Sequence, residues 1–115
     1  MDHKAAKHLF SRNIEAARNT FDSLQNAASD VISAAELIKD ALLRGNKLLS
    51  CGNGGSACDA SHFASEIAGR YVIERPGYPA IDLTADHSLI TALINDYPPE
   101  QVFARQVQAL APAGG

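Results

Sequence analysis

The sequence has few of the residues that stabilise secreted or membrane proteins. It contains no tryptophan, one methionine and two cysteines, and no apolar run approaches the roughly 18 residues of a membrane span. Cys51 and Cys58 fall at a predicted strand end and in the helix that follows it, so we expect no disulfide between them. The tight Cys-x-x-Cys spacing of a zinc site is missing, which disfavours a metal role for the pair. We expect both to be buried, reduced thiols.

A surplus of charge of either sign is also lacking. Ten lysines and arginines against thirteen aspartates and glutamates give a net charge of -3, and the basic residues are scattered along the chain. This pattern predicts no nucleic-acid partner. Residues 1–8 lack the apolar core of a secretory signal, so we expect a cytoplasmic protein without membrane attachment. With 115 residues, of which 46% are hydrophobic, the chain predicts a single small domain.

What the sequence does contain is a glycine-rich turn at the centre of residues 47–71. The apolar pair 48–49 predicts a short strand that is buried on both faces. The glycines of residues 52–55 allow the backbone to approach a ligand closely. Ser56, with Asp59 three residues later, predicts the capped start of a helix. Because a helix N-terminus next to bare glycine amides favours anions, this strand, loop and helix predict a phosphate site.

Two amphipathic helices are predicted before this stretch. The first covers residues 2–28 and has one apolar stripe, formed by Phe10, Ile14, Ala17, Phe21 and Leu24. We favour contact of this stripe with another subunit over packing within the chain. The second helix is capped by Ser29 or Asp30, or begins a turn later at the capping box 33–36, and ends at Gly45 in a left-handed cap.

After the central stretch, the turn-rich segment 74–79 leads into a second strand at 80–83. A short helix follows at 87–94, and residues 95–99 break it. One apolar face then marks a last helix, formed by Phe103, Val107 and Leu110.

This alternation predicts an α/β fold with a parallel sheet. Within the single domain 1–115, we expect residues 1–45 to form a helical hairpin for oligomer packing and residues 46–115 to begin the α/β ligand-binding unit. Only two strands are visible, so we expect the chain to be the first part of a larger domain. The tail, 111–115, has the composition of a loop.

Five motifs in this order and spacing resemble the phosphoheptose isomerase family, the bacterial sedoheptulose 7-phosphate isomerases of the sugar isomerase (SIS) superfamily. They are the segments 50–56, 62–66, 69–71, 75–81 and 95–97. The resemblance covers nearly the whole chain and implies a flavodoxin-like SIS domain that assembles as a tetramer with active sites at subunit contacts. It departs from the family at Pro98-Pro99 and at Gly115, and the family's later phosphate loop and late Gln- and His-bearing helix are absent.

The resemblance also implies residue roles. His62 and Glu66 lie four apart and therefore share one helix face; by itself such a pair is more often a solvated surface pair. Within the family, Glu66 is implied as the catalytic base and a zinc ligand, and His62 as a zinc ligand. The sugar phosphate is implied to contact Asn53, Gly54, Gly55, Ser56, Glu66, Asn95 and Asp96. Arg70 is predicted either as a surface cation or as an active-site group that reaches across a subunit boundary.

The implied activity is conversion of sedoheptulose 7-phosphate to D-glycero-D-manno-heptose 7-phosphate, for lipopolysaccharide core synthesis. A second hypothesis is a non-enzymatic SIS-domain protein that binds the replication initiator, which Glu66 and the segment 75–78 disfavour. A third is an inactive fragment, since half of the family's site is missing.

Overall fold

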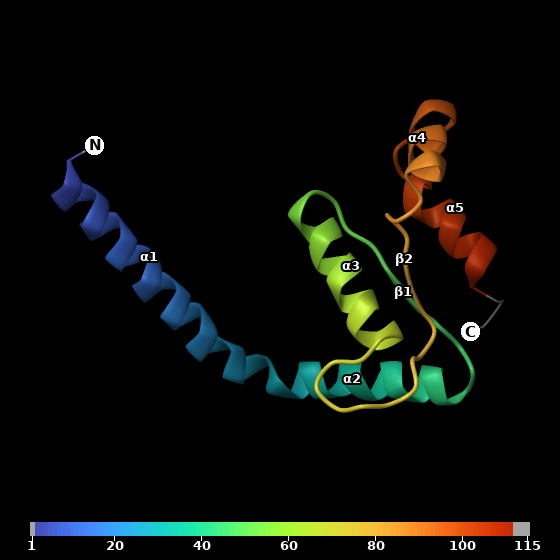
Figure 1. Cartoon of the computed structure of the whole chain (residues 1–115), viewed down its shortest axis with the longest axis horizontal. Helices are drawn as coiled ribbons and strands as arrows, with labels where there is room; N and C mark the ends of the chain where they lie inside the picture. The colour runs from blue at the N-terminus through green and yellow to red at the C-terminus, as the bar shows by residue number, and fades with distance from the viewer. Residues whose placement is uncertain (1, 112–115) are drawn as a thin grey trace. The chain divides into compact units, whose positions relative to one another are not determined.

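The structure is a computed structural model that describes residues 2–111, so most of the tail predicted at 111–115 lies outside the described residues. The chain divides into two units, Met1–Leu37 and Ile38–Gly115, and each is described by itself. The first contains α1 (His3–Ser23), the 3₁₀ helix η1 (Leu24–Ala27) and most of α2 (Ala28–Leu43) (Figure 1).

The predicted break between the first two helices is wrong, as are the caps at Ser29, Asp30 and residues 33–36. The backbone stays helical, passing from α1 through η1 directly into α2, which begins at Ala28. No glycine or proline interrupts residues 24–33, so the chain tightens into a 3₁₀ turn and needs no new cap. The interpretation of residues 1–45 as a helical hairpin stays a prediction, because α2 extends from the first unit into the second.

The apolar stripe of the first helix is exposed, as Phe10 (67%) and Phe21 (71%) show. No residue of α1 is buried. Within the described part of the first unit the stripe is therefore uncovered, and its packing on another subunit stays a prediction.

The end of α2 follows the prediction. Gly45 has φ +82°, its amide donates to the carbonyl of Leu42, and the amide of Asn46 donates to that of Ala41. These two bonds form a Schellman cap, which satisfies carbonyls that the helix end leaves unpaired.

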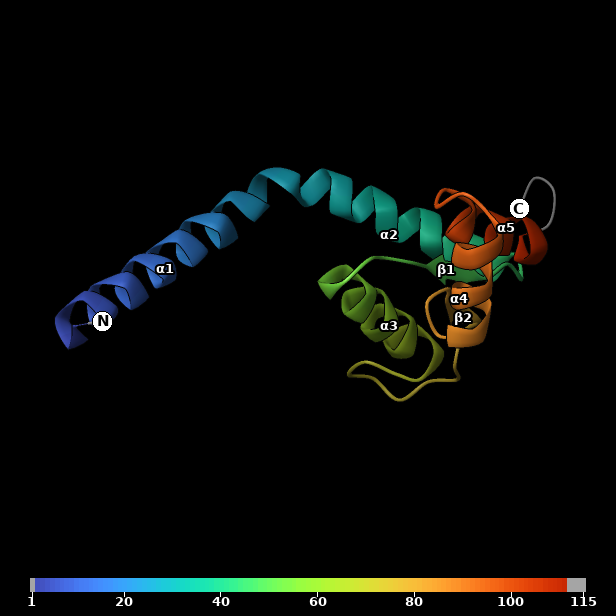
Figure 2. The same ribbon diagram turned by 90° about the horizontal axis from the view of Figure 1, so that it is seen from above.

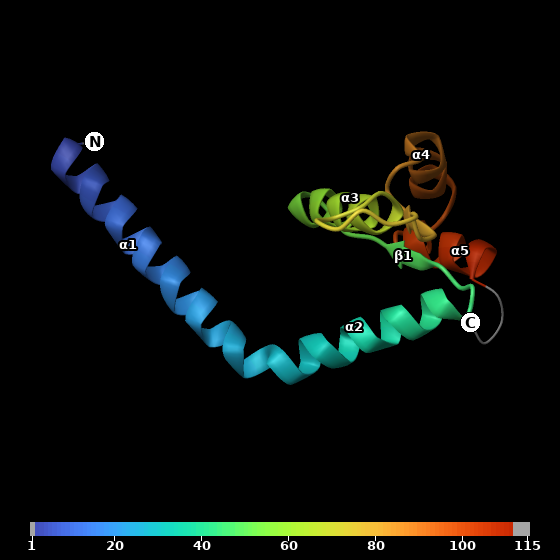
Figure 3. The ribbon, with the colours of Figure 1, turned by 60° about the horizontal axis from the view of Figure 1, so that its bottom comes forward.

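The second unit is a small α/β layer structure. Its parallel sheet consists of β1 (Leu48–Ser50) and β2 (Ala80–Asp82), with Leu48, Leu49 and Ser50 opposite Ala80, Ile81 and Asp82. The crossover is α3 (Gly55–Ala68), which packs on both strands, and α4 (His87–Asp96) packs on α5 (Gln101–Leu110). In all three views the strands lie between α3 and α5 (Figure 1, Figure 2 and Figure 3). The predicted α/β class and parallel sheet are confirmed.

A few residues form the core of this unit. Its buried hydrophobic residues are Ala60, Ala64, Leu83 and Leu93. Gln106 is buried with them, and its side-chain amide donates to the carbonyls of Leu83 and Val102 at 2.9 Å each. The predicted burial of the strand at 48–49 is only partial, because both residues keep intermediate exposure.

Two further predictions about this unit are wrong. Cys51 and Cys58 are free thiols, as expected, but both are exposed: Cys51 begins the loop after β1, and Cys58 lies off the face of α3 that carries the buried Ala60 and Ala64. The predicted end of the helix at residue 94 is wrong by two residues: α4 continues through Asn95 and Asp96 and ends inside the predicted break 95–99, where the amide of Tyr97 donates to the carbonyl of Leu93.

Candidate functional site

The glycine loop between β1 and α3 is tightly curled. Gly54 has φ +58°, a conformation that glycine adopts without strain, and it is the N-cap of α3. The amide of Ser56 donates to the carbonyl of Asn53, and the amide of Ala57 to that of Gly54. The predicted capping box of Ser56 and Asp59 is therefore wrong: the helix begins at Gly55, with no side-chain cap.

Gly52 has a different reason for being glycine. A Cβ at this position would overlap the backbone carbonyl of Ser56 and lie 2.8 Å from the amide nitrogen of Ala57. The chain leaving β1 thus passes against the first turn of α3. Gly55, by contrast, has open space around a Cβ.

A cavity of about 570 Å³ opens beside this loop. Asn53 and Gly54 line it together with Thr84 and apolar residues of α4 and α5, while Gly55 and Ser56 do not. Two of the four loop residues predicted to contact a sugar phosphate therefore face this cavity. It lies beyond the carboxyl ends of the two parallel strands, where ligands of open α/β sheets bind.

The two residues predicted to share one face of α3, His62 and Glu66, are in contact. His62 Nε2 lies 3.0 Å from Glu66 Oε1, and the side chains are 75% and 32% exposed. Both line a small cavity of about 290 Å³, together with Asp59, Phe63 and Tyr71. The pair is open to a ligand, and an imidazole beside a carboxylate can serve in proton transfer or as two metal ligands.

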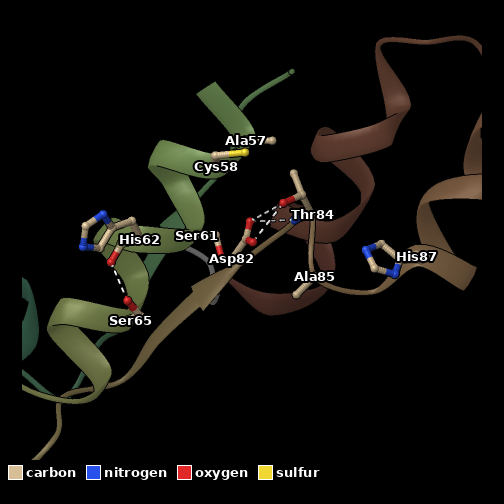
Figure 4. A pocket seen from close by; sticks show the side chains of 9 residues that line it. All are labelled: Ala57, Cys58, Ser61, His62, Ser65, Asp82, Thr84, Ala85 and His87. Carbon is tan, nitrogen blue, oxygen red and sulfur yellow. Dashed lines mark hydrogen bonds between the residues drawn. The ribbon is translucent and has the colours of Figure 1, made fainter. Parts of the chain in front are cut away.

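His62 also lines a polar groove of about 660 Å³ (Figure 4). One wall is α3, and the other runs from the last residue of β2 to the first residue of α4. Sequence reasoning missed Asp82 and Thr84, which lie in this second wall (Figure 4). Their position at the carboxyl end of a parallel strand, Asp82 as its last residue and Thr84 two residues later, was the signal that could have identified them.

Asp82 accepts hydrogen bonds from the Thr84 hydroxyl at 2.7 Å (Oδ1) and 2.9 Å (Oδ2) and from the Thr84 amide at 2.9 Å (Oδ1). Burial raises the pKa of the carboxyl, but hydrogen bonds from Thr84 and Ser61 outweigh burial, so the pKa lies below its ordinary value. Asp82 is therefore ionised at neutral pH and places a fixed negative charge in the groove.

The remaining predicted residues lie apart from these cavities. Asn95 Nδ2 donates to Asp96 Oδ1 at 2.8 Å at the end of α4, and neither residue lines the cavities described above. Arg70 Nε lies 3.2 Å from Glu74 Oε2, with both side chains mostly exposed. This fits the surface-cation interpretation of Arg70.

The described part of the chain offers donor atoms of the types that bind zinc, but only a small number of them lie together. The imidazole of His62 and the carboxylate of Glu66 are ligand types that zinc accepts. Among residues 2–111, no group of three or more histidine, cysteine, aspartate or glutamate side chains is arranged to hold an ion. The described helices also include none that is long and apolar enough to cross a membrane.

Comparison with known proteins places the chain in a class. A family model of the SIS domain matches residues 12–114. The chain therefore belongs to the SIS domain family.

Within that family, the chain is similar to phosphoheptose isomerases, as the sequence motifs predicted. It is 50% identical over 102 residues to the enzyme of Geobacter sulfurreducens and 46% identical over 100 residues to that of Shewanella pealeana. These matches cover 88% and 87% of this chain but 54% and 51% of the relatives. The chain thus spans about half the length of the curated relatives it matches.

Two solved structures of phosphoheptose isomerases are also similar to this chain. A phosphoheptose isomerase from Neisseria gonorrhoeae superposes with a TM-score of 0.79 at 36% identity, covering 93% of this chain and 55% of that chain. A phosphoheptose isomerase from Francisella tularensis superposes with a TM-score of 0.66 at 36% identity, covering 86% of this chain and 56% of that chain.

Proposed function

We propose that this chain carries the glycine loop and the catalytic base of a phosphoheptose isomerase, which converts sedoheptulose 7-phosphate to D-glycero-D-manno-heptose 7-phosphate for lipopolysaccharide core synthesis. The observation that carries the proposal is the His62–Glu66 pair, 3.0 Å apart and open to a ligand, on the helix that begins at the glycine loop. The relatives reported above are all named isomerases, which gives the replication-initiator alternative no support.

The reaction moves a proton between two adjacent carbons. The Glu66 carboxylate removes a proton from C1 of the ketose, and the electron pair shifts to the C2 carbonyl to give an enediolate. Return of a proton from Glu66 to C2, with transfer of the O1 proton to O2, then gives the aldose. His62, in contact with Glu66, orients the carboxylate.

The loop and the end of α4 are proposed to hold the substrate. Asn53 and Gly54 contact the sugar phosphate from the wall of the loop cavity, and Gly55 and Ser56 offer amide and hydroxyl donors at the helix start. Asn95 and Asp96 bind substrate hydroxyls, which requires their mutual hydrogen bond to open.

Zinc is the proposed cofactor, with His62 and Glu66 as two of its ligands. A tetrahedral site needs about four ligands, so further donors must come from outside this pair. When bound, zinc would polarise the substrate carbonyl and so favour charge on its oxygen.

The proposed assembly is a cytoplasmic tetramer. Its support is the exposed stripe of α1, on which Phe10 and Phe21 are each about two-thirds exposed. Apolar side chains repeated along one helix face are typical of helix packing between subunits.

The test is an isomerisation assay in deuterated water, followed by NMR. The 115-residue chain is compared with a version extended by the remaining half of the Geobacter sulfurreducens relative, with and without zinc. We expect turnover and deuterium incorporation at the C2-derived carbon only in the extended form. In that form, Glu66→Gln should nearly abolish both while the fold and assembly persist.

Glu74→Gln is the matched control, because Glu74 is exposed and its ion pair in the described residues is with Arg70. It should leave turnover unchanged. Full activity of Glu66→Gln, or no activity of the extended form with zinc, would discard the proposal.

A further inference from the structure

Arg75 closes the C-terminal end of α3. Its Nη2 donates to the carbonyl of Glu66 at 2.8 Å, and its Nη1 lies 3.1 Å from the carbonyl of Ile67 and 3.3 Å from that of Gly69. Nη1 also donates to the carbonyl of Pro76 at 2.9 Å. The last carbonyls of a helix lack partners within it and carry partial negative charge, so a guanidinium satisfies them both as donor and as cation.

The residues after Arg75 hold it there. The guanidinium carbon lies 4.9 Å from the centre of the Tyr78 ring, a cation–π contact, and the amide of Tyr78 donates to the carbonyl of Ile67 at 3.1 Å. A Cβ at Gly77 would overlap the carbonyl oxygen of Ala68, so this segment lies directly against the end of α3. Residues 75–78 therefore form a strap across the helix end.

We propose that Arg75 is a positioning residue for the catalytic pair of the isomerase. The proposal rests on the proposed function, since it assigns Glu66 as the base. Arg75 binds the backbone carbonyl of Glu66 itself and those of residues 67 and 69, and so fixes the turn of α3 from which the carboxylate extends. The resemblance pointed to the segment 75–81 as a motif but gave it no role.

The physical reason is the sensitivity of proton transfer to geometry. A displacement of the base by about 1 Å can cost on the order of a hundredfold in rate. His62 constrains the Glu66 carboxylate only from its own helix. Arg75 adds a constraint from outside the helix, because it reaches α3 from the segment before β2.

Arg75→Lys in the active extended enzyme separates positioning from stability. Lysine keeps the positive charge, but its ammonium is a single point with three donors and cannot bridge four carbonyls. We expect kcat to fall by about tenfold to a hundredfold with KM within about twofold, because misplacing the base affects the chemical step and not substrate affinity. Amide hydrogen exchange should quicken at residues 66–69.

Two further variants make the comparison sharper. Arg105→Lys is the matched control: Arg105 also stacks on a tyrosine, 4.3 Å from the ring centre of Tyr97, but the described structure gives it no helix-end carbonyl bonds, so kcat should not change. Tyr78→Leu removes the ring under Arg75 and leaves the four carbonyl bonds, so its loss in kcat should be smaller than that of Arg75→Lys.

The outcomes distinguish failure of the positioning role of Arg75 from failure of the proposed isomerase function. A normal kcat for Arg75→Lys, with Glu66→Gln inactive, would overturn the positioning role and leave the isomerase intact. The positioning role would also be overturned if Arg75→Lys lost activity only in proportion to the loss of folded protein, with kcat per folded site unchanged. Full activity of Glu66→Gln would instead overturn the proposed function and the role of Arg75 with it.

Discussion

Replacing Gly52 by alanine tests whether the glycine loop is shaped by the packing of β1 against α3. The added methyl group would overlap the carbonyl of Ser56 and lie 2.8 Å from the nitrogen of Ala57. Both are backbone atoms of the first turn of α3, so they move only if the helix moves. We therefore expect Gly52→Ala to destabilise the second unit.

The magnitude follows from two opposing effects. Overpacking a closely packed site costs about 1–3 kcal/mol. Removing a glycine restricts the unfolded chain, which returns about 0.4–1 kcal/mol. The difference spans about 0–2.6 kcal/mol, and because the overlapped atoms belong to the backbone we expect a loss in its upper part, about 1–2.6 kcal/mol in the free energy of unfolding.

The assay is urea unfolding of the chain, followed by circular dichroism at the helical minimum. Gly55→Ala is the matched control, because Gly55 is a first-turn helical residue with nothing within 4 Å of a Cβ and no positive φ. Alanine there should be neutral or should stabilise by up to about 1 kcal/mol. Equal effects of the two substitutions, or a stabilised Gly52→Ala, would refute the reasoning.

Two other changes probe the second unit. The pKa of Asp82 lies below its ordinary 3.8, so its ionised form stabilises the fold above that value and the contribution is lost as pH falls through the folded pKa. Asp82→Asn should therefore cost about 1 kcal/mol at pH 7, with the difference closing below about pH 3.8 in pH-dependent urea titrations; a constant difference would contradict this. Leu83 is 2% exposed, so Leu83→Ala should cost about 2–5 kcal/mol in thermal unfolding, and a cost below that of Leu89→Ala, at a residue 39% exposed, would contradict its place in the core.

Much of the fold was predictable because the signals were local. Both strands and the last two helices followed from short apolar runs between turn residues, and the Gly45 cap followed from one residue. The start of α3 was missed because a serine followed by an acidic residue imitates a capping box, while the positive φ of Gly54 decides where the helix begins. The break at residues 27–30 was wrong because this segment contains no glycine or proline, and the chain passes through a 3₁₀ turn into α2 without leaving the helical conformation.

The site was predictable only in part. The spacing of His62 and Glu66 placed them on one helix face, and the structure has them in contact. Asp82 and Thr84 bond to each other two residues apart, and they were missed although their place at a strand end is a local signal. Arg75 depends on bonds across the end of α3, which no local pattern reveals. The exposure of Cys58 depends on the direction in which α3 rests on the strands, and that too is a tertiary property.

The exposure of α1 has a thermodynamic consequence. None of its 21 residues is buried, so this helix gains little from packing within the first unit, and helices in proteins owe most of their stability to such packing. Any partner that covers the stripe binds the helical form alone and stabilises it in proportion to the logarithm of the partner's concentration. Lowering the concentration of that partner would therefore destabilise the helix of the first unit, as adding a denaturant would.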